Sequence, residues 1–158
     1  MQEKYILNSY KQTQKLGENF AKEILKLPLG EKALVLGLRG NLGGGKTTFL
    51  QGFAKGLGIK EKILSPTFVI MKHFKFEILN FKFTDFYHID CYRMNGAEEI
   101  LGLGFENIIK NPCNIVAIEW PEKIEKFLPK NTILINFEFV DKNKRNIIIS
   151  SKSPENPN

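Results

Sequence analysis

A glycine-rich stretch, GNLGGGKTT at residues 40–48, carries the most specific chemistry in the sequence. From Gly40 to Thr47 it matches the pattern G-x-x-x-x-G-K-[ST], in which glycines allow backbone N–H groups to surround a phosphate. Lys46 would reach the β- and γ-phosphates, and the Thr47 hydroxyl would reach Mg²⁺. The stretch follows an apolar segment and precedes an amphipathic one, which is the context that the pattern requires. It therefore predicts a loop that binds the phosphates of a nucleotide.

The identity of the base is predicted from the guanine motifs, none of which is intact. Guanine-specific switches usually carry N-K-x-D on a late strand, but the nearest match here, NKRN, ends in Asn146 where the motif needs an acid. No D-x-x-G sequence follows any of the three aspartates, Asp85, Asp90 and Asp141. Adenine is therefore the better prediction, and we expect ATP and Mg²⁺ as the ligands.

Three further residues are candidates for phosphoryl-transfer chemistry, which needs a bound metal and an oriented water. Glu119 ends the apolar segment NIVAIE, and acids at strand ends often face the ligand crevice of an α/β sheet; the alternative is a solvated glutamate. Asp90, in the motif HIDCYR, could position the water, or it could simply pair with Arg93. Thr67, in the motif SPTF, could sense the γ-phosphate as a switch residue does, or cap a turn.

The elements that would position these residues follow from the spacing of apolar side chains. Ser9 and Gln12 form a capping-box pattern at the start of a helix predicted over residues 10–27. The apolar segment 33–38 predicts a buried strand that leads into the glycine-rich loop. A second amphipathic helix is predicted after the loop, as far as Leu57.

The second half of the chain is expected to supply the rest of a sheet. Its segments, in chain order, are two strands over 68–76 and 81–89 that pair with a turn near Leu79–Asn80, one or two short helices over 96–109, a buried strand over 114–120, a short helix from Pro121, and two strands over 132–140 and 145–150. We therefore predict one α/β domain over residues 1–150, with a P-loop NTPase-like mixed sheet flanked by helices. Residues 151–158 are predicted to form a disordered tail.

Composition narrows the class of protein. The chain has 158 residues and a net charge of +6, but only three of its basic residues are arginines, which does not favour a dedicated nucleic-acid reader. No apolar run approaches the roughly 20 residues of a membrane helix, and the polar N-terminal segment has no apolar signal-peptide core. We therefore expect a cytoplasmic protein without a membrane partner.

Taken together, the motifs GNLGGGKTT, SPTF, HIDCYR and IEWPE, in this order and in a chain of this length, resemble the TsaE (YjeE) family of bacterial P-loop ATPases. The resemblance runs from about Thr13 to Arg145. It implies catalytic roles for Asp90, Glu119 and Thr67, and magnesium contacts for Thr47 and Glu119. It also implies nucleotide contacts from the following residues: Thr13, Gly40, Asn41, Leu42, Gly43, Gly44, Gly45, Lys46, Thr47 and Thr48. Asn41 and Gly44 depart from the family's usual aspartate and alanine, but neither change removes a phosphate or metal ligand.

The resemblance also implies a biological role. Proteins of this family are needed to make threonylcarbamoyladenosine, the modified base beside the anticodon of certain tRNAs. By the resemblance, the chain is a weak Mg²⁺-dependent ATPase that acts with the TsaD and TsaB proteins in a nucleotide-dependent complex and reaches tRNA only through that complex. Two alternatives from other classes stay open, an ATP-dependent small-molecule kinase and a nucleotide-sensing binding module.

Overall fold

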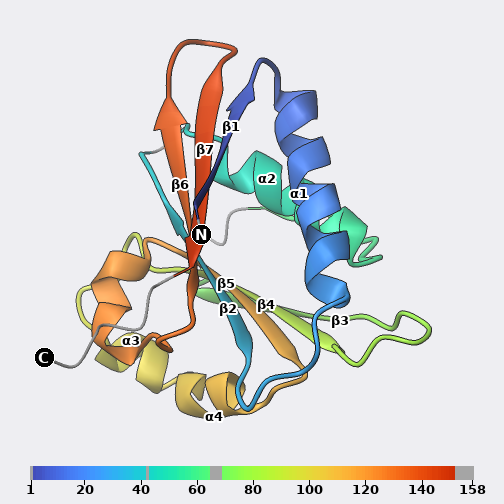
Figure 1. The fold of residues 1–158 in the computed structure, drawn as a ribbon. Helices are drawn as coiled ribbons and strands as arrows, with labels where there is room; N and C mark the ends of the chain where they lie inside the picture. Colours follow the sequence, from blue (N-terminus) through green and yellow to red (C-terminus); the bar gives the residue numbers. More distant parts are fainter. Residues whose placement is uncertain (1, 42, 65–68, 152–158) are drawn as a thin grey trace, which may run out of the picture.

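The chain folds around one seven-stranded mixed sheet with helices on both faces (Figure 1). The computed structural model describes residues 2–41, 43–64 and 69–151. The strand order is β1-β7-β6-β2-β5-β4-β3. The strands are β1 (Gln2–Leu7), β2 (Leu34–Arg39), β3 (Met71–Lys75), β4 (Asp85–Asp90), β5 (Asn114–Glu119), β6 (Ile133–Phe139) and β7 (Arg145–Ser151). The predicted α/β fold with a mixed sheet is confirmed.

Parallel pairing is confined to the centre of the sheet. Strands β6, β2, β5 and β4 run parallel to one another, whereas β7 is antiparallel to β6 and β1, and β3 is antiparallel to β4. Both predicted hairpins, β3–β4 and β6–β7, are present. The first turns near Asn80, which has a φ of 70°, as the sequence predicted. Of the tail predicted over residues 151–158, Ser151 belongs instead to β7, and residues 152–158 lie outside the described residues.

The sheet separates the hydrophobic core into two parts, each covered by helices. The helices are α1 (Tyr10–Leu25), α2 (Lys46–Gly56), α3 (Glu98–Leu101), α4 (Phe105–Lys110) and the 3-10 helix η1 (Pro121–Phe127). Helices α1 and α2 pack on one face of the sheet, and α3, α4 and η1 pack on the other (Figure 1). The alternation along β5 shows the division, because Ile115 and Ala117 belong to the first core while Val116 and Ile118 belong to the second. Glu119 therefore faces the side of α1 and α2.

Strand β1 was not predicted from the sequence. Its segment QEKYIL is mostly polar, and only Leu7 is buried. It lies at an edge of the sheet, where it pairs with β7 from Gln2 opposite Ser150 to Leu7 opposite Arg145. An edge strand with little buried surface lacks the apolar pattern that sequence analysis uses, so pairing with a strand far along the chain determines its structure.

The two helices on the first face approach each other so closely that glycine is required between them. A Cβ atom at Gly17 of α1 would lie 2.1 Å from the carbonyl oxygen of Phe49 in α2. A Cβ atom at Gly52 of α2 would lie 1.9 Å from the carbonyl oxygen of Gln14 in α1. Because these neighbours are backbone atoms, no rotamer change can relieve the clash. The backbone of α1 therefore sets the position of α2.

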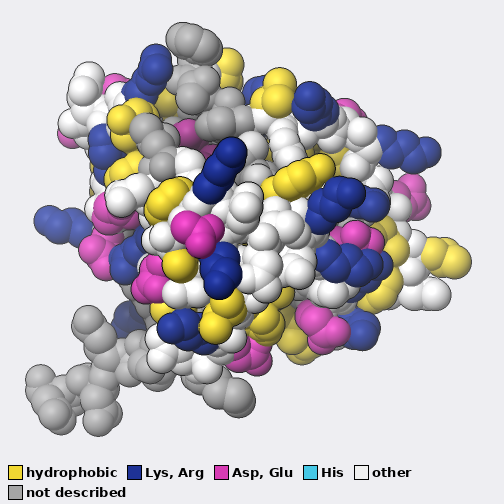
Figure 2. Space-filling view, turned by 90° about the horizontal axis from the view of Figure 1, so that it is seen from above, with side chains coloured by type: hydrophobic (Ala, Val, Ile, Leu, Met, Phe, Trp, Pro, Cys, Tyr) yellow, Lys and Arg dark blue, Asp and Glu magenta, His cyan; other side chains and the backbone are white. Residues whose placement is uncertain are grey.

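No described helix is long and apolar enough to cross a membrane. Charged side chains of both signs are intermixed on the face seen in Figure 2 and form no continuous basic patch there.

The close contact of the helices gives a first prediction. The substitution Gly52→Ala should lower the free energy of unfolding by about 1–3 kcal/mol, the usual cost of overpacking, because the added methyl group meets backbone. The matched control is Gly30→Ala, since a Cβ atom there has only one neighbour within 4 Å, at 3.9 Å. Urea denaturation followed by circular dichroism measures both. Equal stability of the two variants would contradict the close packing.

Candidate functional site

The carboxyl ends of three parallel strands bring the candidate residues together. Strand β2 ends at Arg39, directly before the glycine-rich loop, while β4 and β5 end at Asp90 and Glu119. In the sheet register Glu119 lies opposite Asp90 on one side and Leu38 on the other. Crevices at the carboxyl ends of parallel strands are the usual ligand sites of α/β proteins. Segments far apart in the sequence therefore meet at one edge of the sheet.

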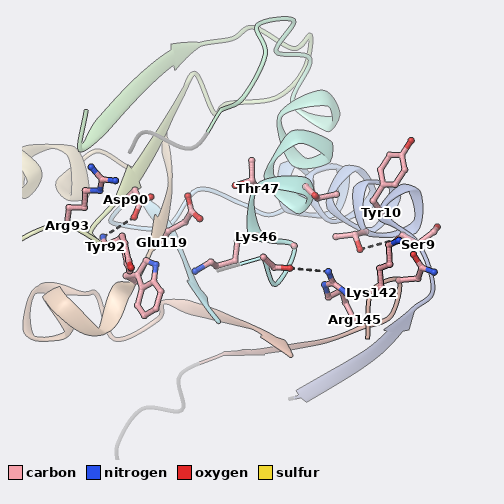
Figure 3. Close-up of a pocket in the computed structure, with 16 residues that line it drawn as sticks. Ser9, Tyr10, Lys46, Thr47, Asp90, Tyr92, Arg93, Glu119, Lys142 and Arg145 are labelled. Carbon is pink, nitrogen blue, oxygen red and sulfur yellow. Dashed lines mark hydrogen bonds between the residues drawn. The ribbon is translucent and has the colours of Figure 1, made fainter. Parts of the chain in front are cut away.

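This edge contains a pocket of about 490 Å³ (Figure 3). Its walls come from the glycine-rich loop and α2, from the ends of β4 and β5, from the start of α1, and from the loop between β6 and β7. The lining residues are Ser9, Tyr10, Thr13, Gly43, Gly45, Lys46, Thr47, Thr48, Asp90, Tyr92, Arg93, Glu119, Trp120, Lys142, Asn143 and Arg145.

Lys46 is the buried cation of this pocket. Lys46 is only 4% exposed, and its Nζ donates a hydrogen bond to the carbonyl oxygen of Gly40 at 2.6 Å. The same Nζ lies 4.4 Å from the centre of the Trp120 ring. Burial lowers the pKa of the ammonium group, and the nearby carboxylates of Glu119 and Asp90 oppose that shift. A buried cation at the first position of a helix attracts an anion strongly.

Three glycines of the glycine-rich loop have a positive φ, among them Gly40 and Gly45. Gly45 immediately precedes α2 with φ 98° and ψ 9°, in the left-handed region. Gly40 has a φ of 148°, and a Cβ atom there would lie 2.7 Å from the carbonyl oxygen of Phe137 in β6. Within the loop the N–H of Gly44 donates to the carbonyl oxygen of Asn41 at 3.1 Å. The loop thus turns tightly between β2 and α2, as the sequence pattern predicts.

Two carboxylates stand opposite the loop. One oxygen of Asp90 accepts a hydrogen bond from the backbone N–H of Tyr92 at 2.9 Å. One oxygen of Glu119 lies 2.8 Å from Nε2 of His88, a fully buried side chain. Glu119 itself is 3% exposed and Asp90 is 8% exposed. Figure 3 shows the Glu119 carboxylate between Asp90 and the end of Lys46, so acids and cation share one end of the pocket.

Trp120 follows Glu119 in a strained conformation. Its φ of 58° and ψ of 51° lie in the left-handed region, which is rare for a bulky residue. Its ring packs against Tyr92, with ring centres 5.1 Å apart, and the backbone N–H of Trp120 donates to the carbonyl oxygen of Leu38 at 3.3 Å. The indole therefore forms part of the pocket wall beside Lys46.

The other end of the pocket is built from residues that the sequence analysis missed. Arg145, at the start of β7, donates through Nη2 to the carbonyl oxygen of Gly43 at 3.1 Å and through Nη1 to that of Lys144 at 2.9 Å. Its guanidinium lies 4.6 Å from the ring centre of Phe139. Backbone N–H groups of residues 143 and 144 donate to Asp141, lower its pKa and shape the turn. The loop between β6 and β7 is thus tied to the glycine-rich loop.

The number of arginines in the chain is a signal that could have indicated Arg145 as a site residue. The chain has three arginines, and two of them, Arg93 and Arg145, line the pocket. Tyr10 and Lys142 also line the pocket. No sequence motif indicates them as site residues, because the residues that they approach in the fold are remote in sequence.

The predicted site residues fall into three groups. Those that line the pocket are Thr13, Gly43, Gly45, Lys46, Thr47, Thr48, Asp90 and Glu119. Gly40, Asn41 and Gly44 are not among the lining residues and shape the loop through the contacts described above. Leu42 and Thr67 lie outside the described residues.

The donor set at the acidic end suits a hard cation. Thr47, Glu119 and Asp90 offer oxygen atoms, and Mg²⁺ is usually held by one or two carboxylates together with substrate phosphates and waters. Among the described residues, no three His, Cys, Asp or Glu side chains form a group that could hold a metal ion. Thr47, Glu119 and Asp90 would therefore hold a magnesium ion only together with ligands from phosphate and water.

Comparison with known proteins agrees with this geometry. The sequence model described as "Threonylcarbamoyl adenosine biosynthesis protein TsaE" matches residues 7–147. The chain belongs to the TsaE family. It is 36% identical to "tRNA threonylcarbamoyladenosine biosynthesis protein TsaE" of Haemophilus influenzae over 133 residues, which cover 84% of this chain and 79% of that protein. It is 38% identical to the Bacillus subtilis protein of the same name over 117 residues, which cover 74% of this chain and 69% of the relative.

A solved structure supports the fold. The crystal structure of the Bacillus subtilis protein YdiB superimposes on this chain with a TM-score of 0.69 and 27% sequence identity, covering 97% of this chain and 87% of the other. The resemblance to TsaE and the P-loop NTPase-like fold predicted from the sequence are therefore both confirmed.

The residue after Asp90 provides a chemical test of the site's packing. Cys91 is fully buried, and burial together with the neighbouring Asp90 carboxylate raises the pKa of its thiol to about 12. At pH 8 only about one part in 10⁴ of such a thiol is ionised, so it should not react. Titration with Ellman's reagent should modify the half-buried Cys113 first and Cys91 only after unfolding. Simultaneous reaction of both thiols in the folded protein would contradict the packing of β4.

Proposed function

We propose that this TsaE-family chain binds ATP with Mg²⁺ and hydrolyses it slowly. The observation that carries the proposal is the convergence of Lys46, Asp90 and Glu119 in one pocket at the first turn of α2. The pocket volume of about 490 Å³ lies within the roughly 300–1,000 Å³ range of small-molecule sites. A positive helix end beside a buried lysine provides the complementary charge that nucleotide phosphates require.

The contacts of the pocket suggest how the nucleotide would lie. The β- and γ-phosphates would lie on the glycine-rich loop, where Lys46 would exchange its bond to the Gly40 carbonyl for a bond to phosphate oxygen. The base would then extend toward Tyr10 and the loop between β6 and β7. The methyl carbon of Thr13 lies 3.7 Å from the point that a Cβ atom at Gly45 would occupy, so Thr13 would flank the nucleotide near the loop.

The acidic end would serve the chemical step. Thr47 and Glu119 would hold Mg²⁺, which would neutralise charge on the transferred phosphate. Asp90 would accept a hydrogen bond from the attacking water and orient it, because its carboxylate is already fixed by the N–H of Tyr92. Thr67 remains the predicted sensor of the γ-phosphate. Such groups act mainly in the transition state, so they affect turnover more than binding.

The biological role follows from the names of the relatives. We propose that the chain supports threonylcarbamoyladenosine modification of tRNA in the cytoplasm, acting with the TsaD and TsaB proteins and contacting tRNA only through them. The indirect role agrees with the small number of arginines, three in the chain, because planar, bidentate recognition of phosphate favours arginine. A nucleotide can control assembly only if ATP and ADP forms differ in their affinity for the partners.

Removal of the central cation tests the nucleotide site. Lys46→Ala should weaken ATP binding by about 10–100-fold, the value of a charge-assisted hydrogen bond, as measured by isothermal titration calorimetry. Lys55→Ala is the matched control, because this lysine lies near the other end of α2 with a largely exposed side chain. Wild-type ATP affinity in Lys46→Ala would contradict the assignment of the glycine-rich loop to the nucleotide site.

Depletion in cells tests the biological role. Mass spectrometry of tRNA nucleosides should show loss of threonylcarbamoyladenosine after depletion of the protein. Re-expression of the wild type should restore the modified base, and re-expression of Lys46→Ala should not, because the proposed role depends on ATP. An unchanged level of the base after depletion would contradict the proposal and would favour the kinase alternative.

A further inference from the structure

His88 is a motif residue that the proposed function leaves without a role. It lies on β4 with its side chain fully buried, and it is opposite Ala117 in the register with β5. Side chains two residues apart on a strand share a face, so His88 faces the same side as Asp90 and Glu119. Its imidazole reaches diagonally to Glu119, with Nε2 2.8 Å from one carboxylate oxygen.

The ring makes one polar contact, and that contact is with Glu119. Nδ1 is buried and has no hydrogen-bond partner among the described residues. A buried nitrogen without a partner costs free energy, so an apolar side chain would fit this position with less loss. The polar chemistry of His88 is thus directed at a single oxygen of Glu119.

We propose that His88 is a positioning residue that holds the Glu119 carboxylate for the magnesium ion. The inference rests on the proposed function, because it assigns the partner of the metal-binding carboxylate. Because a carboxylate oxygen accepts, Nε2 carries the hydrogen and donates it. With one oxygen fixed in this way, the other is left to face the pocket, which Glu119 lines.

Two features of the site make such a tether necessary. Asp90 and Glu119 are directly opposite each other on neighbouring strands, where like charges repel. Lys46 attracts both carboxylates but donates to the carbonyl oxygen of Gly40, whereas Nε2 of His88 contacts Glu119 directly. Hydrogen bonds behind a metal ligand hold it in place, and their loss typically costs about 10–100-fold in metal affinity.

Two substitutions separate the hydrogen bond from simple packing. The amide nitrogen of Gln can occupy the place of Nε2, whereas the shorter Asn reaches only as far as Nδ1. His88→Gln should therefore keep the contact with Glu119, and His88→Asn should lose it. His73→Asn is the control. His73 is the other histidine of the chain and lies on β3, where it is hydrogen-bonded to Asp85 and stacked on Tyr87.

The readout is Mn²⁺ binding to the protein–ADP complex, followed by the electron paramagnetic resonance signal of free Mn²⁺. We expect His88→Asn to weaken Mn²⁺ binding about 10–100-fold, with ADP affinity in EDTA changed less than about threefold. We expect His88→Gln and His73→Asn to stay within about threefold of the wild type, given that neither removes the bond to Glu119. Wild-type Mn²⁺ affinity in a folded His88→Asn, or equal losses in the Asn and Gln variants, would overturn the assignment.

A double-mutant cycle guards against indirect effects. If His88 acts through Glu119, His88→Asn should have no further effect on Mn²⁺ affinity in a Glu119→Gln background. Additive losses would overturn the proposal. If His88→Asn does not fold, weakened Mn²⁺ binding in folded His88→Gln would overturn it instead. If the wild-type protein does not bind Mn²⁺ together with ADP, the proposed function itself is contradicted. That outcome is distinguishable from the results with the His88 variants that would overturn only the role of His88.

Discussion

The backbone contact between α1 and α2 is the constraint on which the site depends. Because no side chain fits between Gly17 and Gly52 and the facing backbone, the two helices have one relative position. Phe49 and Phe53 then pack from α2 against Phe20 of α1 and extend the contact into the core. The same contact brings Thr13 beside the glycine-rich loop. One wall of the pocket is therefore held by helix packing.

The opposite wall depends on the parallel sheet. Pairing of β4 with β5 places Asp90 and Glu119 side by side and buries both. Buried like charges are unfavourable unless cations and donors balance them, and here Lys46, His88 and the N–H of Tyr92 do so. The acids do not contribute to the apolar core, so the arrangement is best understood as a site that the stable core supports.

Local patterns predicted much of this structure. The glycine-rich loop, the Ser9 cap of α1 and the two hairpins are encoded by neighbouring residues, and each was found near its predicted place. The sequence predicted the carboxylates as well, Glu119 from its place at the end of an apolar segment and Asp90 from the motif HIDCYR. It could not predict β1 or the place of Arg145, since each depends on pairing with residues more than 100 positions away. The left-handed conformation of Trp120 likewise depends on the fold around it.

The contacts of Lys46 bear on why such a site would hydrolyse ATP slowly. The ammonium group already has the Gly40 carbonyl and the Trp120 ring as partners, so a phosphate must compete with both. Binding energy is then the difference between two sets of contacts, and uniform binding of substrate does not accelerate the chemical step. Acceleration requires interactions that form only in the transition state. The carboxylates of Asp90 and Glu119 can make such interactions only when they are correctly oriented. A partner protein that shifts the ends of β4 and β5, or the adjoining Trp120, would change that orientation directly. Under the proposed function, turnover would then respond to assembly with the partner.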